Sequence, residues 1–193
     1  MTAIAGRLPV ADAAFGDSQA VGEQLRQALR QHPAGVVVVT AAEGRRPVGL
    51  TVTTFTSVSL SPALVSLLVA RSASVWPTFE QVARIGVHLL PAHASELATT
   101  FARSGADRFA PPTRWVPDVH DVPVLEDAGV RLSCVVHQLI PVGDHVLVVA
   151  QVESVHHPEM ADEPLVWHDG GFASVIPAPP RTQGPSACCP PRL

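Results

Sequence analysis

The stretch VRLSCVVHQLIPVGDHVLVVAQVESV, residues Val130–Val155, decides the class of fold. It contains two long apolar segments, Val130–Ile140 and His145–Val155, which are separated by the tight turn Pro141–Asp144. Two strand-like segments joined by a short turn predict a pair of neighbouring antiparallel strands. The centre of the sequence therefore favours a sheet built from antiparallel strands.

Segments on both sides of this hairpin extend the strand pattern, and the stretches between them predict three helices. Because these helices stand between some strands and not between all, the order differs from the strict alternation of a doubly wound parallel sheet. The pattern favours a mostly β fold, an antiparallel barrel with peripheral α-helices. Further strands are predicted at Val36–Val39, Val48–Leu60, Ala63–Ala70, Ile85–Leu90, Leu165–His168 and Phe172–Ile176.

The helices are predicted from their ends and from their apolar faces. The first begins at its cap Ser18, the second covers Ser74–Val82 with Ser74 as its cap, and the third ends at Gly105. Residues 106–128 hold four prolines and are expected to form a loop. The apolar faces consist of Val21, Leu25, Ala28 and Leu29 in the first helix and Ala94, Leu97, Ala98, Phe101 and Ala102 in the third.

The composition supports a packed core and excludes several classes of function. Of the 193 residues, 47% are hydrophobic and 16% charged, and the net charge of -4 lacks the basic surface that attracts nucleic acids or anionic membranes. Lys and Tyr are absent, which excludes a Walker-type phosphate loop, a Schiff-base enzyme and a Tyr–Lys dehydrogenase. No apolar run approaches the roughly 18 residues of a membrane span, and no secretory signal is found, so we expect a cytoplasmic protein.

The chain divides into three parts. Residues 1–17 lack periodicity and are expected to form a flexible N-terminal arm. Residues 18–176 hold all the predicted strands and helices and form one domain. Residues 177–193, PAPPRTQGPSACCPPRL, are rich in proline, which predicts a disordered tail.

Three segments are candidates for ligand contact. Seven of the eleven residues Thr51–Ser61 carry hydroxyl groups, which indicates either a half-exposed strand or a rim of donors for a phosphorylated ligand. The sequence Arg71-Ser72-Ala73-Ser74 precedes a helix and predicts either a phosphate seat or simply a helix cap. His145 follows a turn at the start of a strand, where it is either a ligand donor at the barrel rim or a surface residue.

Other catalytic patterns are missing from the sequence. His156–His157 and Cys188–Cys189 are adjacent pairs, and neighbouring residues of a strand point to opposite faces, so neither pair predicts a metal site. No G-x-S-x-G motif is present. Cys134 lies in an apolar segment and is expected to be a buried thiol, so no nucleophile is predicted.

Seven pieces of the chain occur in the order in which they are found in a known family. They are PAGVVVVTA (Pro33–Ala41), PVGLTVTTFTSVSLSPALV (Pro47–Val65), RSASVWP (Arg71–Pro77), FARSGADRF (Phe101–Phe109), PVLEDAGVRLSC (Pro123–Cys134), GDH (Gly143–His145) and PLVWHDGGF (Pro164–Phe172). With these pieces the chain from Leu25 to Phe172 resembles the flavin reductase family, the NAD(P)H:flavin oxidoreductases of two-component monooxygenases. The resemblance implies a Greek-key-like split β-barrel that binds FMN or FAD, as a homodimer with the flavin near the subunit interface.

The resemblance also implies which residues bind the ligands. His145 matches a histidine that faces the nicotinamide nucleotide, and Phe172 matches an aromatic residue near it. His88 stands where the family has an asparagine. The implied cofactor-binding residues are Leu50, Thr51, Val52, Thr53 and Thr54 for the flavin ring and ribityl chain, Ser72, Ala73 and Ser74 for the phosphate end, Val87, His88 and Leu89 on a further strand, and His145 and Phe172.

The implied activity is hydride transfer from NADH or NADPH to the flavin, which needs no acid, base, nucleophile or metal from the protein. The reduced flavin would then diffuse to a separate oxygenase, and neither a nucleic acid nor a membrane is expected as a partner. A split-barrel protein that binds flavin or haem without turnover is the main alternative, and His88 is the feature that favours it. An oxidase with tightly bound FMN is a third possibility.

Overall fold

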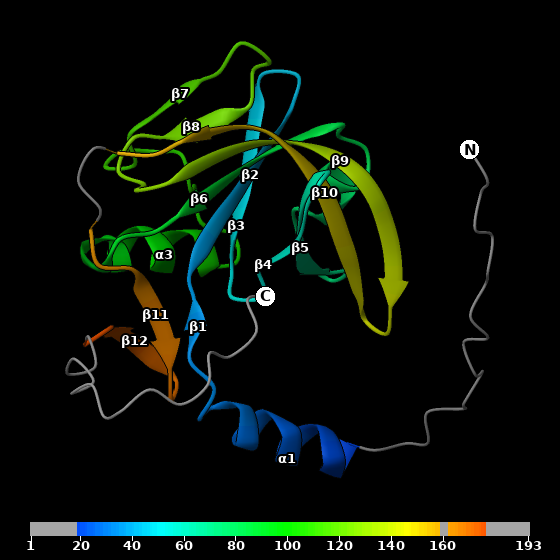
Figure 1. Ribbon diagram of the computed structural model, residues 1–193, viewed down its shortest axis with the longest axis vertical. Helices are drawn as coiled ribbons and strands as arrows, with labels where there is room; N and C mark the ends of the chain where they lie inside the picture. Colours follow the sequence, from blue (N-terminus) through cyan, green and yellow to red (C-terminus); the bar gives the residue numbers. More distant parts are fainter. Residues whose placement is uncertain (1–18, 159–161, 177–193) are drawn as a thin grey trace, which may run out of the picture.

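The computed structural model describes residues 19–158 and 162–176, and its body is a seven-stranded antiparallel sheet (Figure 1). The strands lie in the order β3-β2-β6-β9-β10-β5-β4, and the sheet is strongly curled. The bounds are β2 Val37–Glu43, β3 Arg46–Val52, β4 Thr56–Leu60, β5 Ala63–Ala70, β6 Arg84–Leu89, β9 Arg131–Val142 and β10 His145–His156.

The long hairpin predicted at the centre of the sequence is confirmed as β9 and β10. The two strands are joined by Gly143 and Asp144, and Gly143 has a φ of 57°, a left-handed conformation that glycine adopts without strain. Alternate side chains of β10 are buried, since Val146, Val148 and Ala150 face the inside of the curled sheet. The alternation that predicts the strand therefore also supplies part of the core.

The prediction of one strand over Val48–Leu60 is wrong, because the structure divides this segment into β3 and β4 at opposite edges of the sheet. The segment Thr53–Phe55 carries the chain from one edge to the other. Here the Oγ1 of Thr54 accepts a 2.9 Å hydrogen bond from the backbone N–H of Leu68 in β5, which ties the two edges together. No ladder joins β3 to β4 among the described strands, so the barrel is open along this line, and the mostly β antiparallel fold is confirmed.

A three-stranded sheet lies beside the main one, at the lower left in Figure 1. The two strands predicted near the end of the domain are confirmed, the first with its predicted bounds and the second shifted to Gly171–Ser174, but they pair with β1 and not with the main sheet. The bounds are β1 Ala34–Gly35, β11 Leu165–His168 and β12 Gly171–Ser174.

A two-stranded sheet, β7 (Trp115–Pro117) with β8 (Pro123–Leu125), occupies the region 106–128, for which a loop is predicted. Each of these strands has three residues, one of which is proline. Such a strand is too short to show an alternation of apolar and polar side chains, so the sequence pattern misses it. The Oδ1 of Asp118 accepts hydrogen bonds from the N–H groups of His120 and Val122, at 2.8 and 2.9 Å, and fixes the turn between the two strands.

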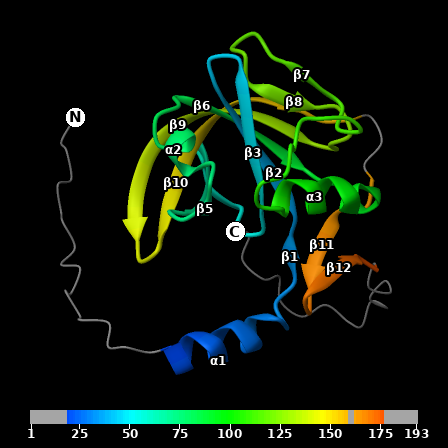
Figure 2. The same ribbon diagram turned by 180° about the vertical axis from the view of Figure 1, so that it is seen from behind.

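The helices are α1 (Gln19–Leu29), α2 (Trp76–Phe79), a 3₁₀ turn at Ala92–Ala94 and α3 (Ser95–Ala102). Of these, α3 packs on β3 (Figure 2). None of the helices in the described ranges is long and apolar enough to cross a membrane.

Two of the predicted helix ends are wrong. The second helix has only one turn and no side-chain cap, because Val75 and not Ser74 is its N-cap. The third ends at Ala102 with Arg103 as its C-cap, and Gly105 lies in the following turn with a φ of 73°.

Two clusters of buried side chains lie on the two faces of the curled sheet. The inner cluster includes Leu67, Val69, Ile85 and Cys134, which confirms the buried thiol. Burial raises the pKa of Cys134 to about 12, and the charge of Glu153 adds to the rise.

The outer cluster packs Val38, Phe101, Leu125 and Leu165 between the sheet, α3 and β8. A Cβ at Gly49 would stand 2.7 Å from Cε1 of Phe101, so this glycine lets α3 lie directly on β3.

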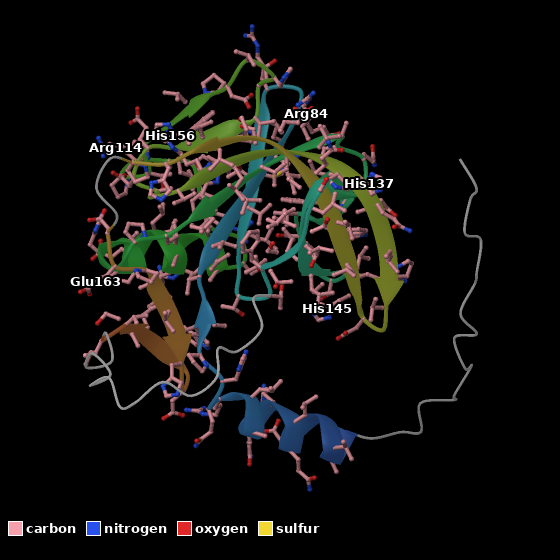
Figure 3. All side chains as sticks on the ribbon, in the orientation of Figure 1. Arg84, Arg114, His137, His145, His156 and Glu163 are labelled. Carbon is pink, nitrogen blue, oxygen red and sulfur yellow. The ribbon has the colours of Figure 1, made fainter. Side chains whose placement is uncertain are left out.

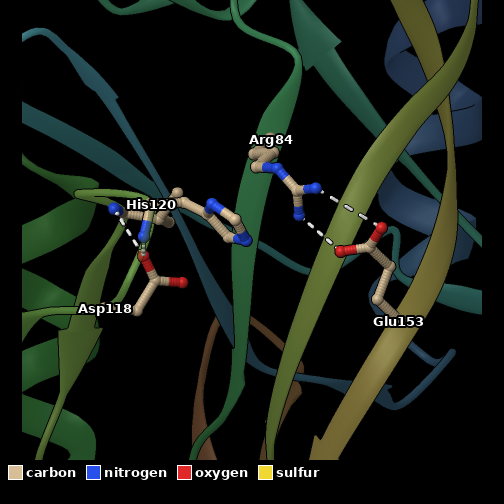
Figure 4. Close-up of polar contacts among 5 residues, drawn as sticks. Arg84, Asp118, His120 and Glu153 are labelled. Carbon is tan, nitrogen blue, oxygen red and sulfur yellow. Dashed lines mark hydrogen bonds and ion pairs between the residues drawn. The ribbon is translucent and has the colours of Figure 1, made fainter.

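An ion pair on the face of the sheet that carries β7 and β8 joins β6 to β10 across β9. Arg84 pairs with Glu153, and His120 lies beside the guanidinium group (Figure 4). Both charged side chains are partly exposed, so the pair stabilises the fold only weakly.

Candidate functional site

An open groove of about 400 Å³ lies between β3, the start of β10 and the β11–β12 hairpin. This volume is within the range of small-molecule sites. The groove brings together predicted residues from four separate segments of the chain, namely Leu50–Thr54, Ala73, His145 and Phe172.

The walls of the groove are mostly apolar. Leu68 and Ala70 of β5 line one side, and Trp167 and Phe172 line another. These two aromatic rings face each other across β11 and β12 with centroids 5.1 Å apart and an interplanar angle of 78°, an edge-to-face arrangement. They remain 39% and 37% exposed, so their surfaces are available to a ligand. Apolar walls and aromatic rings fit flat heteroaromatic groups, a description that covers both the isoalloxazine ring and the nicotinamide ring.

The three threonines of the groove have different roles. Thr51 donates a 2.7 Å hydrogen bond to the carbonyl of Ala98 and so holds β3 on α3. Thr54 is bonded to Leu68 and holds the β3 edge near β5. Thr53 is exposed and makes no side-chain hydrogen bond with any described residue, so its hydroxyl is the free donor of the three.

The predicted phosphate residues lie at one end of the groove. Ala73 lines it, and Ser72 and Ser74 are exposed on either side. The backbone N–H of Arg71 donates a 3.0 Å hydrogen bond to the carbonyl of Asp144, which holds this turn next to the turn between β9 and β10. Two exposed serines therefore flank Ala73 at this end of the groove, and neither of them lines it.

His145 stands at the first position of β10, as the sequence predicts (Figure 3). Its Nδ1 lies 2.6 Å from Oδ1 of Asp144, and this hydrogen bond and the charge of His145 lower the pKa of the Asp144 carboxyl. Since Nδ1 is committed to Asp144, Nε2 is the nitrogen left for a ligand. His145 is the only titratable residue that lines the groove within the described part of the chain.

The predicted strand residues Val87, His88 and Leu89 do not line the groove. Val87 and Leu89 belong to the inner core. His88 points to the opposite face, where its Nε2 accepts a 3.1 Å hydrogen bond from the N–H of Leu125. The Nδ1 must then carry the proton, and it donates to the carbonyl of Val38 at 3.2 Å.

The imidazole of His88 is therefore a buried structural group. Burial lowers its pKa to about 4, with a smaller contribution from the charge of Arg131. A Cβ at Gly86 would stand only 2.9 Å from Cε1 of this ring and 2.6 Å from Oγ1 of Thr40, so glycine leaves room for both polar groups. Thr40 itself donates a 2.6 Å hydrogen bond to the carbonyl of Pro123, and the two contacts hold β8 on the sheet.

Sequence reasoning misses five residues of the groove. Trp167 is the most prominent, and it could have been found from the spacing WHDGGF, which places residues 167 and 172 opposite each other in a hairpin. The remaining four, Val36, Leu68, Ala70 and Ala102, are small or apolar and look like ordinary core positions in the sequence. Cys188 and Cys189 lie outside the described residues.

The open antiparallel barrel has the fold of solved flavin reductase domain proteins. The model of the flavin reductase like domain family matches residues 29–175, and the chain belongs to this family. An NADH:FMN oxidoreductase of Rhodococcus qingshengii is 43% identical over 155 residues, which cover 79% of this chain and 81% of the relative.

Solved structures agree with this membership. A flavin reductase domain protein from Arthrobacter sp. FB24 has a TM-score of 0.78 and 29% identity, over 83% of this chain and 99% of that protein. BorF, the flavin reductase component of a bacterial two-component tryptophan halogenase, has a TM-score of 0.73 and 26% identity, over 81% of this chain and 99% of its own.

Proposed function

We propose that this protein is an NAD(P)H:flavin oxidoreductase that reduces FMN or FAD for use by a separate oxygenase. The observation that carries the proposal is the groove, which joins Leu50–Thr54, His145 and two aromatic rings in a member of the flavin reductase family. The relatives named as an NADH:FMN oxidoreductase and as the reductase component of a halogenase support the reaction and the separate partner.

The bound flavin supplies the redox chemistry, and the protein supplies orientation and shelter from water. In the proposed complex the segment Leu50–Thr54, which is the end of β3 and the two residues after it, would hold the flavin ring, and the hydroxyl of Thr53 would donate to the ring's polar edge. Ser72 and Ser74 hold the phosphate end. The Nε2 of His145 would contact the nicotinamide nucleotide, as an acceptor when the imidazole is neutral and as a donor when both ring nitrogens are protonated. The side chains of Trp167 and Phe172 would exclude water from the reacting rings.

The groove also supports release of the reduced flavin. Among the residues 19–158 and 162–176, His145 is its only titratable lining residue, so these residues place few fixed charges on the ligand. Since no acid or base is needed for hydride transfer, an apolar open groove is compatible with turnover and with diffusion of the product to an oxygenase. We place this exchange in the cytoplasm, where the sequence predicts the protein to be.

The non-catalytic alternative loses its supporting feature. The alternative of a protein without turnover depends on His88, which stands where the family has an asparagine. The side chain of His88 is buried on the face of β6 that points away from the inner core, and it does not reach the groove. The oxidase alternative differs from a reductase in its colour on purification, because an oxidase would retain yellow FMN.

The function is tested by mixing the purified chain with NADH or NADPH and each flavin in a stopped-flow instrument. We expect the absorbance of the nicotinamide to fall only when flavin is added, and the protein to be pale as isolated. Turnover without added flavin would favour the oxidase, and no flavin-dependent loss of NADH or NADPH would contradict the proposal.

We also propose that the chain forms a homodimer through α1. The predicted apolar face is present, but Val21, Leu25 and Leu29 are 59%, 56% and 54% exposed, so the described part of the chain does not cover it. An amphipathic helix with an uncovered apolar face is typical of an interface. Trp167 lines both the flavin groove and the hollow beside α1, which supports a subunit interface close to the flavin.

Light scattering after size-exclusion chromatography tests the dimer. We expect a dimeric mass for the wild type and a monomeric mass for Leu25→Glu, because a charge cannot be buried in the apolar interface without a partner. Gln27→Glu adds the same charge on the opposite, polar side of the same helix, and this control should remain dimeric. A monomeric wild type would contradict the proposal.

A further inference from the structure

The aromatic wall of the groove is carried by a hairpin that packs little against the main sheet. Trp167 and Phe172 lie on β11 and β12, next to the turn that joins these strands. At its base the hairpin is anchored by Leu165, which is buried and bonded through its backbone to Leu90 and Val36. At its tip the ties are to one segment, the end of α1 and the strand β1 that follows (Figure 1).

Three hydrogen bonds join the tip to Arg30, the first residue after α1. The Nε of Arg30 donates to Oδ1 of Asp169 at 2.9 Å, and a terminal nitrogen donates to the Asp169 carbonyl at 2.8 Å. In return the N–H of Asp169 donates to the carbonyl of Arg30, also at 2.9 Å. The contact spans 139 positions of the sequence, so it is a tertiary tie and not a local turn.

The turn itself is shaped for this contact. Asp169 and Gly170 both have positive φ, 49° and 80°, the combination found in tight hairpin turns. A Cβ at Gly170 would stand 3.0 Å from a terminal nitrogen of Arg30, so the guanidinium group lies directly over the turn. Asp169 is one of two described non-glycine residues with positive φ. The backbone conformation of Asp169 shapes the turn over which the guanidinium group lies, and its carboxylate accepts a hydrogen bond from Arg30.

We propose that Arg30 and Asp169 are positioning residues that hold Trp167 and Phe172 in place as the wall against which the nicotinamide nucleotide binds. The inference rests on the proposed function and goes beyond it, because neither residue lines the flavin groove. Trp167 is paired directly with Ala34 of β1, so the segment from Arg30 to β1 holds the hairpin at two points. When the contact between Arg30 and Asp169 is lost, the tip of the hairpin and its aromatic rings are free to move away from the groove.

The variant Arg30→Gln tests the proposal, with Arg26→Gln as the matched control. Arg26 is in the last turn of α1, lines the same hollow as Arg30 and, among the described residues, pairs only with its helical neighbour Glu23, in an ion pair 2.8 Å long. For Arg30→Gln we expect KM for NAD(P)H to rise about two- to fivefold with kcat nearly unchanged, as expected for loss of an exposed contact that supports binding. The control should behave as the wild type.

Asp169 offers an independent arm of the same experiment. Asp169→Ala removes the carboxylate acceptor, leaves the backbone carbonyl that also accepts from Arg30, and should raise KM as Arg30→Gln does. Asp169→Asn keeps a side-chain acceptor oxygen, tolerates positive φ and should restore most of the wild-type value. The double variant Arg30→Gln/Asp169→Ala should be no worse than either single variant, because the two residues act as one unit.

Flavin binding and thermal stability separate the possible outcomes. If Arg30 acts by positioning Trp167 and Phe172, the Kd of FMN, measured by the quenching of its fluorescence, and the Tm should change little in these variants. An unchanged KM in Arg30→Gln, equal effects of Arg30→Gln and Arg26→Gln, or a loss confined to flavin affinity would overturn the inference. A wild-type protein that never oxidises NAD(P)H would overturn the proposed function instead.

Discussion

Replacing His145 by alanine is expected to lower kcat/KM for NAD(P)H by roughly fivefold to a hundredfold, which corresponds to losing one polar contact of about 1 kcal/mol, or up to about 3 kcal/mol if the imidazole is charged. His145 lines the groove, and its Nδ1 is bonded to Asp144, so the variant removes the only titratable side chain that the described residues place in the groove wall. The Kd of the flavin should change much less. Stopped-flow reduction at several NAD(P)H concentrations gives both quantities.

His137→Ala is the control for this experiment. His137 is exposed on β9, does not line the groove and lies away from His145 in Figure 3. Its replacement should leave kcat/KM and flavin affinity unchanged. If His145→Ala weakened flavin binding and spared the NAD(P)H kinetics, His145 would face the flavin and not the nicotinamide nucleotide.

Mild acid should destabilise the protein through His88. The pKa of this imidazole is about 4 in the folded protein and 6.5 in the unfolded chain, so between these values the unfolded chain binds a proton that the folded protein does not. Stability is therefore complete above pH 6.5 and falls as the pH drops, by about 3 kcal/mol at pH 4 from this group alone. Protonation of the folded state would also break the bond from Leu125 to Nε2.

Urea unfolding at a series of pH values measures this effect. His88→Gln removes the titrating group, so the free energy of unfolding should depend less on pH between 6.5 and 4 than in the wild type. His137→Ala, which removes an exposed imidazole, should keep the wild-type pH dependence. Equal slopes for the wild type and His88→Gln would show that His88 titrates alike in the folded and unfolded states.

The parts of the fold that the sequence predicts well are those with a clear period. Alternation along β10 and the turn at Gly143 identify the central hairpin, and the apolar face of α3 identifies that helix. The division of Val48–Leu60 is not predictable in this way. Its residues are uniformly suited to a strand, and the break at Thr53–Phe55 exists because the curled sheet brings its two edges together there.

The same distinction applies to the site. Some of the predicted ligand-binding residues lie on turns and at strand ends, and of these Thr53, Ala73 and His145 do reach the groove. His88 does not, because residues of a strand buried on both faces alternate between two environments and the sequence does not tell which face holds the ligand. Trp167 is missed because its role depends on a hairpin held in place by Arg30, a residue far away in the sequence.

The buried thiol has a consequence for the chemistry that the protein performs. Reduced flavin reacts with dioxygen, so a flavin reductase works in the presence of the peroxide that this reaction yields. The thiolate is the form that peroxide oxidises, and a thiol with a pKa of about 12 is almost entirely protonated at neutral pH. Cys134 is the only sulfur-bearing side chain in the described part of the chain, so the packed interior contains no group that its own by-product readily attacks.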